Sequence, residues 1–207
     1  MSKTIFSRLW ILRILGITFL LTSTYIVYFT LSSGKPRSFW ENLGNKINVY
    51  EIPGQFEDQD GKNIALKALS GKNAIVTFVF KDCGMTCPLI MQDLRSFERV
   101  TPTWSTEGQF IVIMLEDHRG KSADLREFLK RYQITSDHWR VLTTDAKTLR
   151  SVADAFKIEY KKGDKGEYMY LHSNYFAVAD KRGKIKQEIR GLERDKAKFA
   201  DLIQGAL

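Results

Sequence analysis

One stretch of the sequence, Thr77-Phe78-Val79-Phe80-Lys81-Asp82-Cys83-Gly84-Met85-Thr86-Cys87-Pro88, predicts the fold, and it holds the only two cysteines of the chain. It continues an uncharged, β-branched and aromatic run from Ala74, which is typical of a buried strand. Pro88 suits the first position of a helix, because its missing N–H would have no partner there. Cys83 and Cys87 are therefore expected at a strand-to-helix turn, where the helix dipole favours the thiolate. The alternative is a pair of buried structural cysteines, against which the Gly84 turn and the Pro88 helix start both argue.

The rest of the chain alternates between strand and helix patterns on both sides of this turn. Asp60-Gly61 is a hairpin signal within Gln55–Leu69. Helices with an apolar face are expected after Pro88, from a cap at Ser122, from a cap at Thr144 or Asp145, and at the C-terminus. Lys161–Glu167 is expected to be a charged loop. The remaining strands are expected at Ala74–Phe80, Gln109–Leu115, Trp139–Leu142, Tyr175–Val178 and Ile185–Ile189.

This order predicts an α/β fold with a mainly parallel sheet that helices cover on both faces. An N-terminal β-hairpin precedes the sheet, and a closing antiparallel hairpin followed by a helix gives the thioredoxin-like arrangement. The thiol turn then lies at the C-terminal end of a central strand, where such sheets bind ligands.

The three histidines of the chain differ in their expected positions. In a thioredoxin-like fold the loop before the third main strand packs against the thiol loop, and thioredoxins place a cis-proline there. His172 stands at that place in this chain, so we expect it to join the thiols. His118 is expected at the same end of the sheet, and both His118 and His138 are expected to have ordinary surface or core roles. The prolines, none of which falls at that place, are Pro36, Pro53, Pro88 and Pro102.

Two thiolates and one imidazole would make a three-coordinate site of soft ligands. Thiolates select Cu(I), and imidazole suits either copper state. Zinc usually takes a fourth ligand. Three ligands leave an open face, which suits passing a metal on. Met85 is expected to be an apolar contact at the rim, with a weak thioether ligand as the alternative.

These residues resemble the Sco/SenC family of copper proteins from cytochrome oxidase assembly. The family pattern is F-x-F-T-x-C-P-x-x-C-P with a D-H-S-like histidine far downstream, and this chain has Phe78 to Pro88 and then Leu171-His172-Ser173. The resemblance covers roughly residues 50–207. Three departures are Gly84 for the first motif proline, Leu171 for the acidic residue, and Glu116-Asp117-His118-Arg119 for the family's D-P-x-R-D.

The resemblance implies a thioredoxin-like fold, one N-terminal membrane anchor, and copper ligands that match Cys83, Cys87 and His172. It implies a chaperone that delivers copper to the binuclear site on the copper-bearing subunit of cytochrome c oxidase, or to another extracytoplasmic copper protein. The alternative is a thiol–disulfide reductase, in which Cys83 and Cys87 act as a redox pair that keeps the cysteines of a partner reduced. A non-catalytic interaction module is a third possibility. A peroxidase is disfavoured because P-x-x-x-T-x-x-C is missing before Cys83.

The N-terminus predicts a membrane anchor. Ile14–Leu31 is an uncharged run of eighteen residues, just long enough to span a bilayer as a helix. The chain has 207 residues, which allows one domain and an appendage, and a net charge of +8. Five lysines and arginines but no acid lie in residues 1–37. The basic excess therefore sits beside the predicted anchor, which favours a role in membrane orientation and disfavours nucleic-acid binding.

The expected organisation is a cytoplasmic basic tail over residues 1–13, the anchor over 14–31, a linker over 32–47 and the thioredoxin-like domain over 48–207. Basic residues before the span favour a cytoplasmic N-terminus and a domain on the other side. We expect the inner membrane of a bacterium with the domain in the periplasm; the alternative is the mitochondrial inner membrane facing the intermembrane space. A cleaved signal peptide is the alternative to the anchor.

Overall fold

The computed structural model describes residues 16, 22–25, 47–84, 86–162, 168–170, 175–191 and 195–207. The chain divides into two compact units, Met1–Asn42 and Leu43–Leu207. In the first unit Gly16 and Thr22–Tyr25 are described, and they are helical. The rest of the predicted span Ile14–Leu31 lies outside the described residues. Within the described ranges, no helix has both the length and the apolar character needed to cross a membrane.

A seven-stranded sheet forms the centre of the second unit, as far as the structure describes it. Across the sheet the strands are β2 (Asn63–Ile64), β1 (Phe56–Asp58), β5 (Trp139–Thr143), β4 (Gly108–Met114), β3 (Asn73–Val79), β8 (Tyr175–Ala179) and β9 (Ile185–Arg190). All five strands that were predicted by residue range are confirmed to within one residue at each end. The predicted N-terminal hairpin is formed by β1 and β2.

The direction of the strands differs from the prediction. β3, β4 and β5 run parallel, with Val79 opposite Met114 and Ile113 opposite Leu142. β1 is antiparallel to both of its neighbours, and so is β8. The sheet is therefore mixed, and the expectation of a mainly parallel sheet is wrong. The predicted hairpins account for the antiparallel pairs β1–β2 and β8–β9. The pairs that join these hairpins to the parallel strands, β1–β5 and β3–β8, are also antiparallel.

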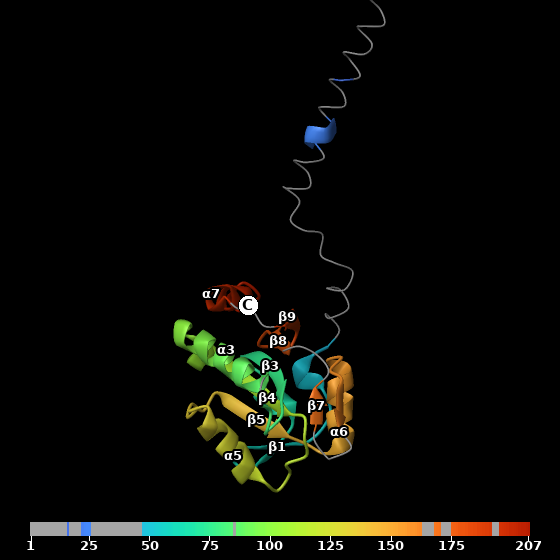
Figure 1. Ribbon diagram of the computed structural model, residues 1–207, viewed down its shortest axis with the longest axis vertical. Coiled ribbons are helices and arrows are strands. Elements are labelled where there is room, and N and C mark those ends of the chain that lie inside the picture. Colours follow the sequence, from blue (N-terminus) through green and yellow to red (C-terminus); the bar gives the residue numbers. More distant parts are fainter. Residues whose placement is uncertain are drawn as a thin grey trace, which may run out of the picture. The chain divides into compact units, whose positions relative to one another are not determined.

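Two hydrophobic clusters lie on opposite faces of this sheet. Ile75 and Val79 of β3 point into the first cluster, and Ala74, Val76 and Phe78 into the second, as expected from the alternation of side chains along a strand. Helices α3 (Thr86–Val100), α5 (Ser122–Arg131) and α7 (Lys196–Gln204) cover the first face, and α6 (Ala146–Ala155) covers the second (Figure 1). The prediction of helices on both faces is confirmed.

The helix starts agree with the sequence in part. The Asp145 carboxylate caps α6 by accepting the backbone N–H groups of Lys147 and Thr148, both at 3.0 Å, as predicted. Ser122, however, is the first residue of α5 and does not cap it. Pro88 is the third residue of α3, two positions later than predicted. A proline is tolerated there because the N–H groups of the first turn have no intrahelical partner.

Several short elements were not predicted. η1 (Val49–Glu51) and η2 (Leu66–Leu69) are 3₁₀ turns, and α4 (Trp104–Glu107) precedes β4. β6 (Tyr160–Lys162) pairs with β7 (Tyr168–Tyr170) in a separate two-stranded sheet. The expectation of a loop over Lys161–Glu167 is therefore wrong for its first two residues, and the rest of it lies outside the described residues.

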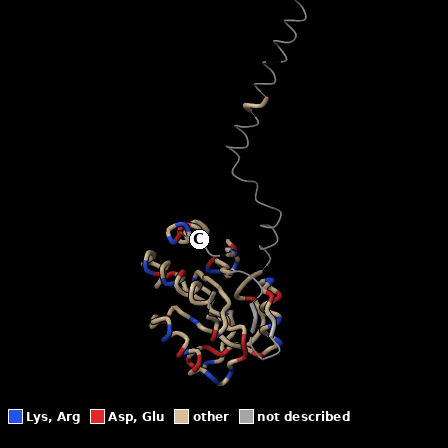
Figure 2. The backbone as a smooth tube through the Cα atoms, viewed as in Figure 1, with Lys and Arg blue, Asp and Glu red and all other residues tan. Residues whose placement is uncertain are grey.

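One side chain extends the pairing between β1 and β5. The Gln59 amide follows the last residue of β1, donates to the Trp139 carbonyl at 3.1 Å and accepts the Val141 N–H at 3.0 Å. Gln59 is buried. Basic and acidic residues are interspersed along the backbone around this core (Figure 2).

Candidate metal and thiol site

Cys83 and Cys87 lie where β3 passes into α3, so the predicted strand-to-helix turn is confirmed. Cys83 is partly buried and Cys87 is 3% exposed. The backbone N–H of Cys87 donates to the Cys83 sulfur at 3.3 Å, and the N–H of Phe80 donates to the Cys87 sulfur at 3.4 Å. Both sulfurs are thus held by backbone donors between the end of β3 and the start of α3.

The expectation that the helix dipole favours both thiolates is wrong for Cys87. Burial raises the pKa of the Cys87 thiol well above its usual range, and the hydrogen bond with Cys83 raises it further. The Phe80 N–H acts in the opposite direction but is outweighed. The cause is the loss of water around a charged sulfur, which costs more than one backbone donor returns. The Cys87 thiol therefore stays neutral until it loses its proton to bind a metal ion or to react.

Helix α5 borders the thiol turn, which the sequence pattern did not indicate. Arg131, its last residue, donates through Nη1 to the Lys81 carbonyl at 2.9 Å. Asp124 in its first turn forms an ion pair with the Lys81 ammonium at 3.0 Å. The next residue after α5, Tyr132, packs against the same core cluster as Cys83. Burial raises the pKa of Tyr132, and the neighbouring Cys87 and Cys83 raise it further.

His118 lies at the same end of the sheet as the thiols, as predicted. It follows β4, and the Leu115 N–H donates to the Val79 carbonyl at 2.9 Å, so the ends of β3 and β4 are side by side. Its two ring nitrogens face carboxylates: Nε2 lies 2.5 Å from Glu116 and Nδ1 lies 3.2 Å from Asp124. Because both nitrogens are engaged, the structure supports the predicted ordinary role and not that of a metal ligand.

His138 lies at the other end of the sheet, directly before β5. Its Nε2 is 2.5 Å from the Glu98 carboxylate, which also accepts the Trp139 indole N–H at 3.1 Å. The ring is buried. The predicted core role of His138 agrees with this arrangement.

His172 and Met85 lie outside the described residues, so their predicted roles stay predictions. The strand after His172 is described. β8 runs antiparallel to β3 with Phe176 opposite Thr77, and the Thr77 hydroxyl donates to the Tyr175 carbonyl at 2.8 Å. β8 therefore begins beside the end of β3 that leads to the thiols. Within the described ranges, no group of three or more His, Cys, Asp or Glu residues is arranged to hold a metal ion.

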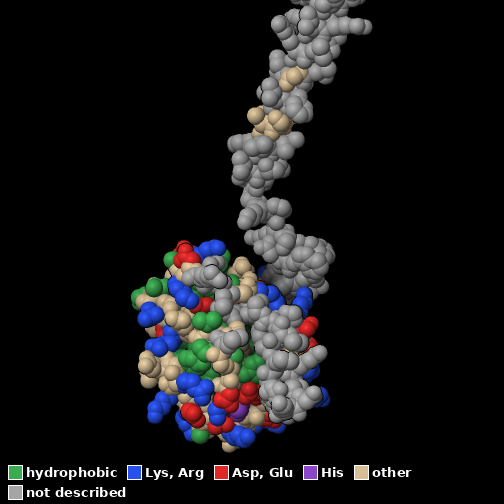
Figure 3. Space-filling view, in the orientation of Figure 1, with side chains coloured by type: hydrophobic (Ala, Val, Ile, Leu, Met, Phe, Trp, Pro, Cys, Tyr) green, Lys and Arg blue, Asp and Glu red, His purple; other side chains and the backbone are tan. Residues whose placement is uncertain are grey.

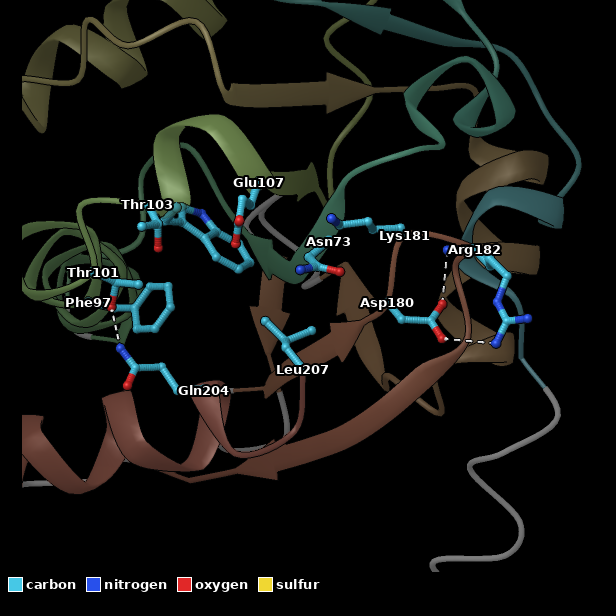
Figure 4. A pocket seen from close by; sticks show the side chains of 11 residues that line it. Asn73, Phe97, Thr101, Thr103, Glu107, Asp180, Lys181, Arg182, Gln204 and Leu207 are labelled. Carbon is cyan, nitrogen blue, oxygen red and sulfur yellow. Dashed lines mark hydrogen bonds and ion pairs between the residues drawn. The ribbon is translucent and has the colours of Figure 1, made fainter.

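A cleft of about 530 Å³ lies at the end of the sheet where β3 begins, away from the thiols. Asn73 at the start of β3, Asp180 and Lys181 in the turn after β8, and Leu207 line it together with other residues (Figure 4). Neither cysteine is among its lining residues. The chemistry expected from the sequence is therefore located at the thiol turn and not in this cleft.

The sequence model of the SCO1/SenC family matches residues 46–207, and the chain belongs to this family. A curated relative, the SCO1 protein homolog of Bacillus subtilis (strain 168), is 26% identical over 155 residues, which is 74% of this chain and 80% of that protein. Among the solved structures, Bradyrhizobium japonicum ScoI with copper bound is 22% identical with a TM-score of 0.62, over 75% of this chain and 98% of that one.

A second solved structure is BsSco, described as a member of the Sco family of cytochrome c oxidase assembly proteins with a disulfide switch. It is 24% identical with a TM-score of 0.62, over 76% of this chain and 93% of that one. These likenesses confirm the α/β thioredoxin-like fold that the order of elements predicts.

Proposed function

We propose that this protein is a membrane-anchored copper chaperone that carries copper on Cys83, Cys87 and His172. It delivers the metal to the binuclear copper site of cytochrome c oxidase, on the copper-bearing subunit, or to a similar extracytoplasmic protein. Its domain faces the periplasm from a single N-terminal span over Ile14–Leu31, with the mitochondrial intermembrane space as the alternative compartment.

The observation that carries the proposal is the pair of sulfurs at the start of α3. The Cys87 N–H reaches the Cys83 sulfur, so the two sulfurs lie on one turn of chain. Thiolates are the protein ligands that Cu(I) prefers, so the donor set fits this metal. Sulfur binds metal as thiolate, so copper uptake must release the proton of Cys87, and copper binding is expected to strengthen as the pH rises.

The position of β8 supports His172 as the third ligand. Tyr175 begins β8 next to Thr77 of β3, and His172 is three residues before Tyr175. This short separation in sequence from a strand that begins beside the end of β3 is what supports His172 as the third ligand. The match to the SCO1/SenC family and the copper bound in Bradyrhizobium japonicum ScoI support copper as the cargo.

The test is copper binding by the reduced protein and by its His172→Ala variant. The wild type should bind one copper ion per chain and His172→Ala should lose Cu(II), because two thiolates are a poor site for that ion without the imidazole. Cu(I) should be held at least about tenfold more weakly, which corresponds to about 1.4 kcal/mol. His138→Ala, at the far end of the sheet, is the control and should bind both ions normally. A reduced wild type that takes up no copper would refute the chaperone.

A second function, a thiol–disulfide reductase, is favoured by the different exposure of the two thiols. The partly exposed Cys83 can attack a partner disulfide, releasing one partner thiolate and forming a mixed disulfide. The buried Cys87 then attacks the Cys83 sulfur and releases the second partner thiolate, so two electrons pass to the partner. This route does not need His172. Two results together would favour the reductase over the chaperone. They are a wild type that binds no copper and a His172→Ala variant that reduces a peptide disulfide at the normal rate.

A further inference from the structure

A chain of charged side chains connects the end of β4 with the segment before Cys83. Glu116 lies against Nε2 of His118 at 2.5 Å, and Nδ1 of His118 lies 3.2 Å from Oδ2 of Asp124. The other oxygen of Asp124 lies 3.0 Å from the Lys81 ammonium. Lys81 is two residues before Cys83. A histidine among acidic side chains is also visible low on the face drawn in Figure 3.

His118 is the link on which this chain depends. The residue is 9% exposed, and its backbone N–H donates to the hydroxyl of the fully buried Thr143 at 2.8 Å. A neutral imidazole has one N–H, whereas the imidazolium has two and can donate to Glu116 and Asp124 at once. The hydrogen bond to Glu116 raises the pKa of His118, and Asp124 adds to this, while burial opposes it. With His118 charged, the four side chains sum to zero charge.

Both ends of this series of contacts, Lys81 and Glu116, lie in segments next to the thiol turn. On one side, α5 holds Lys81 twice, through Asp124 and through the hydrogen bond from Arg131 to the Lys81 carbonyl. This fixes the path of the backbone into Cys83, whose sulfur must lie within reach of the Cys87 N–H. On the other side, the N–H of Leu115, directly before Glu116, donates to the Val79 carbonyl at 2.9 Å, which holds the end of β4 beside the strand that leads to Cys83.

We infer that His118 is a positioning residue for the two thiols. By bridging Glu116 and Asp124 it ties the end of β4 to α5 and, through Lys81, holds the segment that carries Cys83 in register with the start of α3. Without the bridge one carboxylate loses its donor, and the anchor of Lys81 is loosened. The inference rests on the proposed function only in taking Cys83 and Cys87 as the reactive pair.

The molecule contains a matched control for this role. His138 is also buried, and its Nε2 also lies 2.5 Å from a glutamate, Glu98. It differs from His118 in standing before β5, at the end of the sheet away from the thiols. Each imidazole is a donor to a partly buried glutamate, although Glu98 keeps the Trp139 indole N–H and the Ser136 hydroxyl as further donors, so His138→Gln is the control for losing a buried imidazole far from the thiols. The effects of the two losses on the thiols should differ.

The experiment measures the rate at which iodoacetamide alkylates Cys83 in the reduced full-length protein in detergent, at one neutral pH and without copper. His118→Gln should slow alkylation about three- to tenfold, because a loosened Cys83 segment weakens the hydrogen bond from the Cys87 N–H that favours the Cys83 thiolate. Lys81→Gln removes the ion pair with Asp124 and should also slow the alkylation of Cys83. His138→Gln should react at the wild-type rate. The double variant Glu116→Gln with His118→Gln restores the charge balance but not the bridge, so it should stay about as slow as His118→Gln.

Wild-type rates in both His118→Gln and Lys81→Gln would overturn the inference. Equal slowing by His118→Gln and His138→Gln would do the same, since it would indicate general loosening of the fold. A double variant that returns to the wild-type rate would also overturn the inference, since it would show that charge and not positioning sets the rate. If His118→Gln fails to fold, Lys81→Gln alone decides. Slower alkylation of Cys83 in Lys81→Gln supports the inference, and an unchanged rate refutes it. Because no copper is present, failure of the chaperone proposal leaves these outcomes intact.

Discussion

His118 is a buried imidazole held between two carboxylates, and this makes its contribution to stability depend on pH. The Glu116 carboxylate is the main cause of its raised pKa, Asp124 contributes less, and burial works against both. An unfolded chain has no such partners, and its histidines titrate near pH 6.5. The native state therefore binds the proton of His118 more tightly than the unfolded state does.

We predict that His118 stabilises the native state at low pH and loses this contribution as the pH rises. The contribution is fully present below the unfolded pKa of about 6.5 and disappears as the pH passes through the raised folded pKa. Urea unfolding of wild type and His118→Gln over a pH series measures it as the difference between their free energies of unfolding. That difference should be largest at and below about pH 6 and should shrink above it. A difference that grows with pH would contradict the prediction.

The sequence was sufficient to predict the thiols because their geometry is local. Cys83 and Cys87 are four positions apart at the end of an apolar run, and neighbouring backbone groups supply their hydrogen bonds. The partners of His118 are a different case. Asp124 comes from the next helix and Lys81 from the strand loop 37 positions earlier, so their meeting depends on how α5 packs. Nothing in the local pattern encodes that packing.

At the scale of elements, the junction of α4 and β4 is tightly packed. Gly108 begins β4, and a Cβ added there would collide with the Trp104 ring. Trp104 is 3% exposed and packs edge-on against Phe97 at 5.1 Å between ring centroids. The ring is therefore in contact with Phe97 and Phe110 as well as lying against Gly108, so an added Cβ would force it to shift.

We predict that Gly108→Ala lowers the free energy of unfolding by about 1–3 kcal/mol, the usual cost of overpacking a filled core. Gly84→Ala is the matched control, because no atom lies within 4 Å of a Cβ placed there. It should change stability by less than about 0.5 kcal/mol. Urea unfolding of the two variants tests this pair of expectations. Equal stability of the two variants would show that Trp104 is freer to move than the structure indicates.

The elements also show where the pattern of the sequence stops being informative. Long buried strands such as β3 and β4 were predicted closely, because an uncharged and mostly apolar run of seven residues leaves little alternative. The direction of β1 relative to β5, and of β8 relative to β3, was not predicted, because a strand has the same sequence pattern whichever way it runs. β7 was missed because three residues form too short a pattern. Ser122 failed as a cap because α5 begins one residue earlier than the rule places it.

At the scale of the whole molecule, the two units differ in their content of core residues and of charge. The unit Leu43–Leu207 contains both hydrophobic clusters and all the described strands. The family match begins at residue 46, close to the boundary between the units. The five basic residues before position 38, with no acid among them, belong to the other unit.

We predict that protease added to cells with an opened outer membrane cuts within residues 32–47 and releases the domain. The released fragment should keep its far-UV circular dichroism, because its core lies wholly within Leu43–Leu207. A cytoplasmic marker protein should stay intact in the same sample and serves as the control. Mass spectrometry of the untreated protein completes the test: a mature chain that starts after Ser32 or Ser33 would replace the anchor by a cleaved signal peptide.

The Gln59 amide has a consequence for how copies of this domain meet one another. β1 is only three residues long and pairs with β5 at Thr143 and Leu142, so the rest of β5 would offer bare peptide groups at a sheet edge. Such groups are a template on which a strand from another chain can add. The Gln59 side chain occupies the Trp139 carbonyl and the Val141 N–H with the same two hydrogen bonds that an intruding strand would make. A single amide thus protects this part of the domain against aggregation by strand addition.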